Sequence, residues 1–67
     1  MTAETVDRLR VTMQQMERMI RALDDLKENV LPKDPHLFAV MSEGPLEVLG
    51  RLREELEGYV DEFTPAA

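Results

Sequence analysis

The sequence predicts an all-α antiparallel helical hairpin, and three observations support this fold class. Apolar residues recur at alternating spacings of three and four in two long stretches, which is the heptad pattern of helices packed side by side. Proline and aspartate gather between the stretches, at residues 32–35, where they favour a short connection. Each stretch would be about 40 Å long as a helix, and arms of equal length joined by a short connection are expected to be antiparallel neighbours.

The first predicted helix covers about residues 3–30, a range that contains neither glycine nor proline. Its heptad repeat places apolar residues at the core positions a and d, and further ones at the neighbouring g position. The a and d residues are Val6, Leu9, Met13, Met16, Ile20, Leu23 and Val30, and the g residues are Met19 and Leu26. An apolar surface this wide favours a helical bundle over a simple two-stranded coil.

The return arm is predicted to be kinked or broken. Asp34 followed by Pro35 is typical of a helix start, because aspartate caps the N-terminus and proline fits the first turn. We expect a short helix over about residues 35–42, since proline at position 45 cannot donate a hydrogen bond to the preceding turn. One long helix with a kink is the alternative interpretation.

A further helix is predicted over about residues 45–63, where the heptad pattern returns. Its apolar a and d residues are Leu46, Leu49, Leu56, Val60 and Phe63, and Leu52 and Tyr59 widen the apolar surface at g. Residues 64–67 are expected to form a frayed tail. Residues 1–67 together are expected to form one domain, because a chain of this length supports only a single small core.

Composition excludes several classes of function. The formal net charge is −6, and the acids concentrate in residues 34–67, which carry eight acids and two bases. The acidic charge disfavours binding to phosphates. A nucleic-acid-binding helical hairpin stays a lesser alternative, because the polar half of the first predicted helix carries Arg8, Arg10, Arg18 and Arg21. No apolar run approaches the ~20 residues that cross a bilayer, and the N-terminus lacks the features of a signal peptide. The absence of cysteine excludes disulfides and fits a cytoplasmic location.

Few residues could carry chemistry. Met13, Met16 and Met19 could ligate Cu(I) through their thioethers, but methionine at core positions is ordinarily a packing residue. His36 has no positioned partner in the sequence, and we interpret it as a surface residue near a helix start. The acidic clusters lack the Glu-x-x-His pattern of di-metal bundles. We therefore predict no catalytic residues, no metal and no cofactor, and we do not expect an enzyme.

Lys27 and Arg53 interrupt the apolar repeat, because both occupy a positions. Polar residues at such positions often fix the register or the oligomeric state of coiled coils. They could also extend from the edge of the core to water. A third interpretation is that they contact an anion or a substrate between subunits, which is our second functional hypothesis.

The leading hypothesis is a small protein–protein interaction module, such as an adaptor, an accessory subunit or a regulatory subunit. A two-helix monomer would leave part of each apolar surface exposed to water, so we expect a homodimeric four-helix bundle. A larger protein is a further partner that the same surfaces could bind. The predicted interface residues are Met13, Met16, Met19, Ile20, Leu23, Leu26, Leu37, Phe38, Leu49, Leu52, Leu56, Tyr59 and Phe63.

Overall fold

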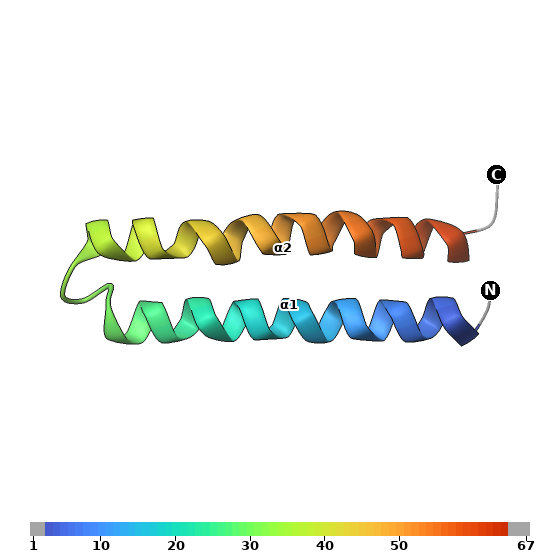
Figure 1. Cartoon of the computed structure of the whole chain (residues 1–67), viewed down its shortest axis with the longest axis horizontal. Helices are drawn as coiled ribbons and strands as arrows, with labels where there is room; N and C mark the ends of the chain where they lie inside the picture. Colours follow the sequence, from blue (N-terminus) through green and yellow to red (C-terminus); the bar gives the residue numbers. More distant parts are fainter. Residues whose placement is uncertain (1–2, 65–67) are drawn as a thin grey trace.

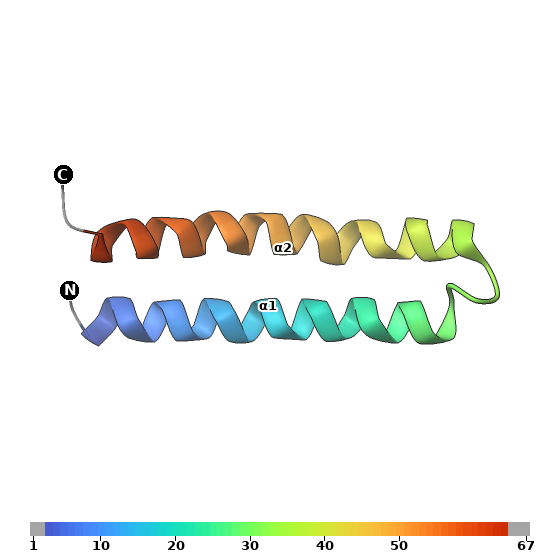
Figure 2. The same cartoon turned by 180° about the vertical axis from the view of Figure 1, so that it is seen from behind.

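The protein is two long helices joined by a short turn, and the computed structural model describes residues 3–64 (Figure 1). Helix α1 runs Ala3–Asn29 and helix α2 runs Pro35–Phe63. The helices lie side by side and antiparallel, and the view from behind shows the same arrangement (Figure 2). The predicted all-α helical hairpin is therefore confirmed, and residues 3–64 contain no strand.

The turn between the helices is held by backbone hydrogen bonds and by the predicted cap. The carbonyl of Val30 accepts hydrogen bonds from the backbone N–H groups of Lys33 and Asp34, at 3.0 and 2.8 Å. The side chain of Asp34 then accepts from the N–H of Leu37 at 3.0 Å, with Pro35 in the first turn of α2. This aspartate satisfies a donor that would otherwise be unpaired at the helix start, which confirms the sequence-based interpretation.

The prediction of two separate helices in the return arm is wrong. Residues 35–42 and 45–63 belong to one helix, α2, which contains Pro45 in its interior (Figure 1). Proline at this position removes only the hydrogen bond to the Met41 carbonyl, and the turns on both sides remain hydrogen-bonded. Pro45 is half-buried, so its ring also contributes apolar contact in the space between the helices. A cost of about 3 kcal/mol for one proline does not break a helix of 29 residues that packs along its whole length.

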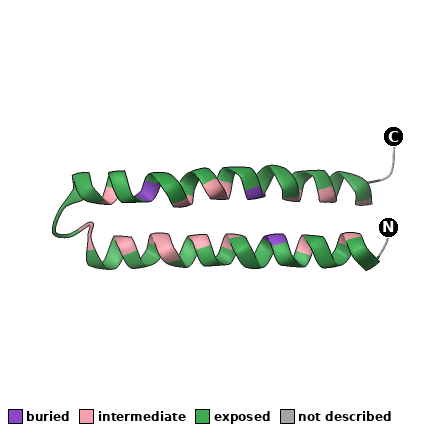
Figure 3. Ribbon diagram, in the orientation of Figure 1, coloured by how far each residue is buried: buried purple, intermediate pink, exposed green. Residues whose placement is uncertain are grey.

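The helices pack through one line of residues on each, which we call the hairpin seam. All of its members are buried or half-buried, and in Figure 3 the buried and half-buried positions lie mainly on the facing sides of the two helices. The seam consists of Thr5, Leu9, Thr12, Met16, Met19, Leu23, Leu26 and Val30 from the first arm and Phe38, Ser42, Pro45, Leu49, Leu52, Leu56, Tyr59 and Phe63 from α2. These residues occupy the d and g positions of the heptads, so the predicted pairing of a with d does not describe the contact within the hairpin.

The choice of d and g over a and d has a physical reason. The a positions contain Lys27 and Arg53, whereas the seam contains no charged residue. Burying an ionised side chain is costly unless it is fully paired. Rotating each helix slightly keeps both cations at the surface and buries the g residues instead.

The interior between the helices is thin. Among the described residues, Leu52 is the only apolar residue that is buried, at 4% exposure. No side chain among them is more than 98% buried. Thr12 and Ser42 are the buried polar residues. The Ser42 hydroxyl donates to the Phe38 carbonyl one turn earlier, at 2.7 Å.

The predicted frayed tail over residues 64–67 lies mostly outside the described residues. Thr64, its described member, ends α2 in an extended conformation. Its N–H donates to the Asp61 carbonyl at 3.3 Å and its hydroxyl to the Val60 carbonyl at 3.1 Å. Thr64 is therefore a hydrogen-bonded cap of the helix.

Candidate interaction surface

Large apolar side chains remain exposed on one face of the hairpin, and we call this set the exposed stripe. Its members all occupy a positions, and each is 38–56% exposed. They are Val6, Met13 and Ile20 on α1 and Leu46 and Val60 on α2. The a position follows d around each helix, and in an antiparallel pair that packs through d and g the two a lines lie on the same face.

A groove between the helices confirms this placement for the half of the face nearer the turn. Ile20 and Lys27 of α1 line it together with Leu46 of α2, and Leu23 and Ser42 from the seam line it as well. The groove has a volume of about 450 Å³ and is lined almost wholly by apolar atoms. The stripe and the exposed edge of the seam therefore form one continuous apolar surface here.

Two cations, Lys27 and Arg53, share the a positions with the exposed stripe, and acids of their own helices engage both of them. Lys27 Nζ lies 2.9 Å from Asp24 Oδ1 and 3.8 Å from Glu28 Oε1. The hydrogen bond and the charge of Asp24, followed by the charge of Glu28, raise the pKa of Lys27 above its ordinary value. On α2, Arg53 Nε donates to Glu57 Oε1 at 3.0 Å. The positive charges on this face are thus balanced locally.

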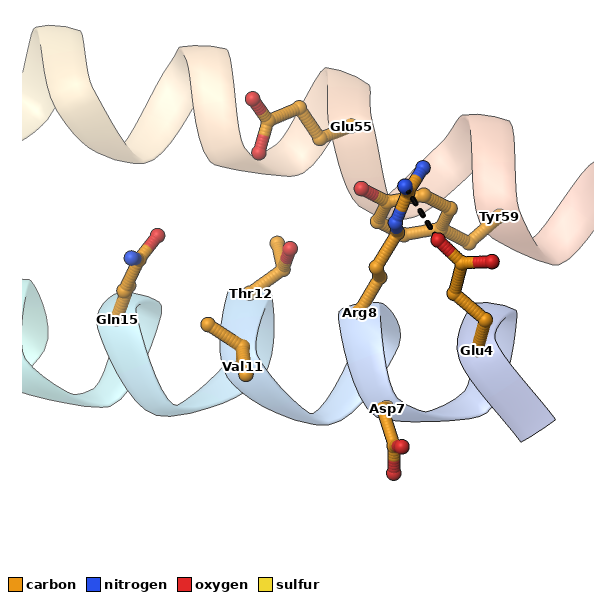
Figure 4. A pocket seen from close by; sticks show the side chains of 8 residues that line it. All are labelled: Glu4, Asp7, Arg8, Val11, Thr12, Gln15, Glu55 and Tyr59. Atoms are coloured by element: carbon orange, nitrogen blue, oxygen red, sulfur yellow. Dashed lines mark hydrogen bonds and ion pairs between the residues drawn. The ribbon is translucent and has the colours of Figure 1, made fainter.

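The opposite face of the hairpin is more polar. Near the open end, Thr12 and Tyr59 line a groove together with charged residues that include Arg8 and Glu55 (Figure 4). Arg8 is held by an ion pair with Glu4, at 2.7 Å, while the Asp7 side chain points away from α2 (Figure 4). This face offers alternating charges and short polar side chains in place of a continuous apolar line.

The predicted interface residues are divided by the structure into three groups. Ten of them lie in the hairpin seam: Met16, Met19, Leu23, Leu26, Phe38, Leu49, Leu52, Leu56, Tyr59 and Phe63. Met13 and Ile20 lie in the exposed stripe, so the candidate Cu(I) ligands Met13, Met16 and Met19 are divided between two surfaces. Leu37 belongs to neither surface and is 44% exposed in the first turn of α2.

A smaller exposed cluster surrounds that first turn. Val40 and Met41 are also about half exposed there, and His36 is exposed beside them. These residues do not share one heptad position. They therefore form a patch around the end of the hairpin, whereas the exposed stripe follows the length of the helices.

Sequence reasoning missed three members of the exposed stripe as candidate contact residues, namely Val6, Leu46 and Val60. It treated them as core residues, because a and d together form the usual coiled-coil core. The signal that could have found them is charge: of the three apolar positions, a alone contains cations. These cations, Lys27 and Arg53, can be read from the sequence alone.

Comparison of the chain with protein-family models, curated proteins and solved structures finds no match. Within residues 3–64, no helix is long and apolar enough to cross a membrane. The same residues contain no group of three or more histidine, cysteine, aspartate or glutamate side chains that could hold a metal ion. The functional argument therefore depends on the surfaces of the hairpin.

Proposed function

We propose that this chain is a protein–protein interaction module that acts through its exposed stripe and that associates as a dimeric four-helix bundle. The observation that carries this proposal is the position of the exposed apolar residues. Five of the nine large apolar side chains that are exposed in the described part share one heptad position and one face. Scattered exposed apolar residues are normal on a protein surface, but several that gather on one face mark a contact site.

The size of the exposed surface supports the same proposal. The accessible surface of the chain is 5329 Å², whereas the scaling law for compact monomers of 7.7 kDa gives about 4,300 Å². The excess of roughly 1,000 Å² is close to the ~800 Å² that each partner buries in a standard interface. The broad face of the hairpin, 49 × 21 Å, is large enough to supply that contact.

The ion pairs on the stripe also favour burial of this face. A lone lysine or arginine in an interface would lose its hydration without compensation. Here Lys27 and Arg53 enter already paired with Asp24 and Glu57, and their aliphatic stems can cover apolar surface while the charged ends stay at the rim. Because these acids already engage both cations, no observation favours an anion site or a catalytic site between subunits.

The role of such a module is to bring proteins together. A helical surface of a larger partner would compete with the second copy for the same apolar stripe, and an adaptor, accessory or regulatory subunit is the class of function that we propose. We expect it to act in the cytoplasm, on the basis of its lack of cysteine.

The test compares two exposed apolar residues of α1 that differ in the face they occupy. Ile20, in the stripe, is 55% exposed, and Val11, which lines the polar groove of the other face, is 50% exposed. A dimer would bury Ile20 twice, at about 1.5–3 kcal/mol each, so Ile20→Gln should raise the dimer dissociation constant by about 100-fold or more. Sedimentation velocity and light scattering over about 1–200 μM provide the measurement.

Val11→Gln is the matched control, because it removes a similar exposed apolar side chain from the same helix. We expect its dissociation constant to stay within about threefold of the unsubstituted chain, as surface changes are usually worth less than 0.5 kcal/mol. Equal effects of the two substitutions would show that the stripe has no special role. An unsubstituted chain that remains monomeric over the whole concentration range would overturn the proposed dimer.

A further inference from the structure

The charge distribution points to one arrangement of the dimer: a second copy covers the exposed stripe so that the turns of both copies lie at the same end of the bundle. This inference rests on the proposed function, since it takes the exposed stripe as the contact surface. Two hairpins can stack through the same face in only two symmetric ways. A dyad parallel to the helices places α1 on the partner's α2, and a dyad across the helices places each helix on its own copy.

The helices carry very different charges, which separates these two arrangements. Helix α1 contains six acids and five bases, whereas α2 contains seven acids and two bases. The arrangement with turns at opposite ends places the strongly acidic α2 against a second α2. The same-end arrangement places each α2 against a nearly neutral α1, which lowers the repulsion between subunits.

The same-end arrangement also fixes the alignment of the helices. A dyad parallel to the helix axes leaves every residue at its own height along the bundle. The groove near the turn indicates these heights, because Ile20 and Lys27 of α1 line it together with Ser42 and Leu46 of α2. Each residue of α1 therefore meets, on the partner's α2, residues with the same numbers as those that lie at its height on α2 of its own hairpin.

At these heights, oppositely charged residues at the rim of the stripe meet across the dimer. Each of the pairs joins an a or e position of α1 to an a or e position of α2 and occurs twice by symmetry. The pairs are Arg10 with the partner's Glu57, Glu17 with the partner's Arg53, and Lys27 with the partner's Glu43. Asp24 also comes to the height of the partner's Glu43, where its charge is offset by its ion pair with Lys27. In the opposite-end arrangement, Arg10 comes close to the partner's Asp24, but Glu43 comes close to the partner's Glu57 and Glu17 comes close to its own copy. Charge complementarity of this kind selects orientation more than it adds affinity.

The test uses a spin label on a chain that has no cysteine of its own. Lys33→Cys places a label in the exposed turn between the helices. With both turns at one end, pulsed electron paramagnetic resonance should measure an inter-subunit distance below about 30 Å, since neighbouring helix axes are only 8–10 Å apart. With turns at opposite ends, the labels would be separated by the length of a helix, about 43 Å or more.

Gln14→Cys provides the matched control, because Gln14 is exposed and lies near the middle of α1. Its label should give a distance below about 30 Å in either arrangement, since both keep mid-height residues close together. A short distance at position 14 with a long one at position 33 would overturn the same-end arrangement and leave the dimer standing. The absence of any inter-subunit distance at both positions would overturn the dimer and this inference with it.

Discussion

Two polar residues, Thr12 and Ser42, are buried between the helices, and their hydroxyl groups differ in their hydrogen bonding. Ser42 donates its hydroxyl to the Phe38 carbonyl within its own helix, so its burial leaves no unpaired donor. The Thr12 hydroxyl takes part in none of the hydrogen bonds found among residues 3–64, although Thr12 is only 4% exposed. No buried side-chain polar atom among residues 3–64 lacks a partner, so the Thr12 hydroxyl meets solvent at the groove that Thr12 lines and gains no hydrogen bond within the hairpin.

Replacing Thr12 by valine should therefore stabilise the protein. Thr12→Val keeps the shape of the side chain and exchanges a hydroxyl for a methyl group, whose burial is worth about 0.8 kcal/mol. We expect the free energy of unfolding to rise by about 1 kcal/mol, measured by urea denaturation at a fixed protein concentration. A lower free energy of unfolding would mean that the hydroxyl has a partner in the assembled protein.

At the scale of the helices, much of the fold could be predicted from the sequence. The spacing of Val6, Leu9 and Met16 predicts a long helix, and Asp34 with Pro35 predicts the start of the second, because both signals are local. The local pattern at Pro45 allowed both a broken arm and one long helix, and it could not decide between them, since packing along the whole helix outweighs one unfavourable position.

The spacing of the apolar residues alone also could not predict which face of each helix packs inward. Apolar residues occupy a, d and g, so a/d and d/g are both adequate seams. The energetic difference between them lies in the cost of burying two cations, Lys27 and Arg53. The candidate site depended on that choice, because the a line becomes the exposed stripe once d and g are used inside the hairpin.

Glycines in α2 offer a test of how the outer face of this helix is used. A Cβ atom built at Gly58 meets nothing within 4 Å, and the residue occupies an exposed position away from the stripe. Gly58→Ala should therefore raise the free energy of unfolding by about 0.5–1 kcal/mol, because alanine has the higher helix propensity. Denaturation by urea measures the change.

Glu54→Ala is a suitable control for that substitution. Glutamate and alanine are both good helix formers, and Glu54 is exposed, so we expect a change within about 0.5 kcal/mol. If Gly58→Ala destabilised the protein while Glu54→Ala did not, a close helix approach at Gly58 would be indicated, and the contact surface would have to be sought on the outer face.

At the scale of the whole molecule, the isolated hairpin is long and thinly packed. Its radius of gyration is 15.5 Å, whereas a compact domain of 67 residues is expected at about 11 Å. A molecule of this shape has little interior, and most of its apolar side chains are only half-buried. Association through the stripe would convert these half-buried residues into the core of a thicker bundle.

Folding and association should therefore be coupled, and the melting temperature should depend on protein concentration. We expect the midpoint of thermal unfolding, followed by circular dichroism at 222 nm, to rise as the concentration increases from about 5 to 500 μM. The Ile20→Gln variant should show a lower midpoint at each concentration. A midpoint that is independent of concentration would indicate a monomer that is stable by itself.

The unbroken seven-residue repeat of the hairpin seam has a consequence for the shape of the helices. A straight α-helix drifts by about 20° for every seven residues relative to such a repeat. The seam extends from Thr5 to Val30 and from Phe38 to Phe63 without a change of phase, even at Pro45. Straight helices would lose contact towards their ends, so we expect α1 and α2 to wind around each other as a left-handed supercoil. Each copy would then present a twisted face, and any helix that covers the exposed stripe along its full length would have to follow the same handedness.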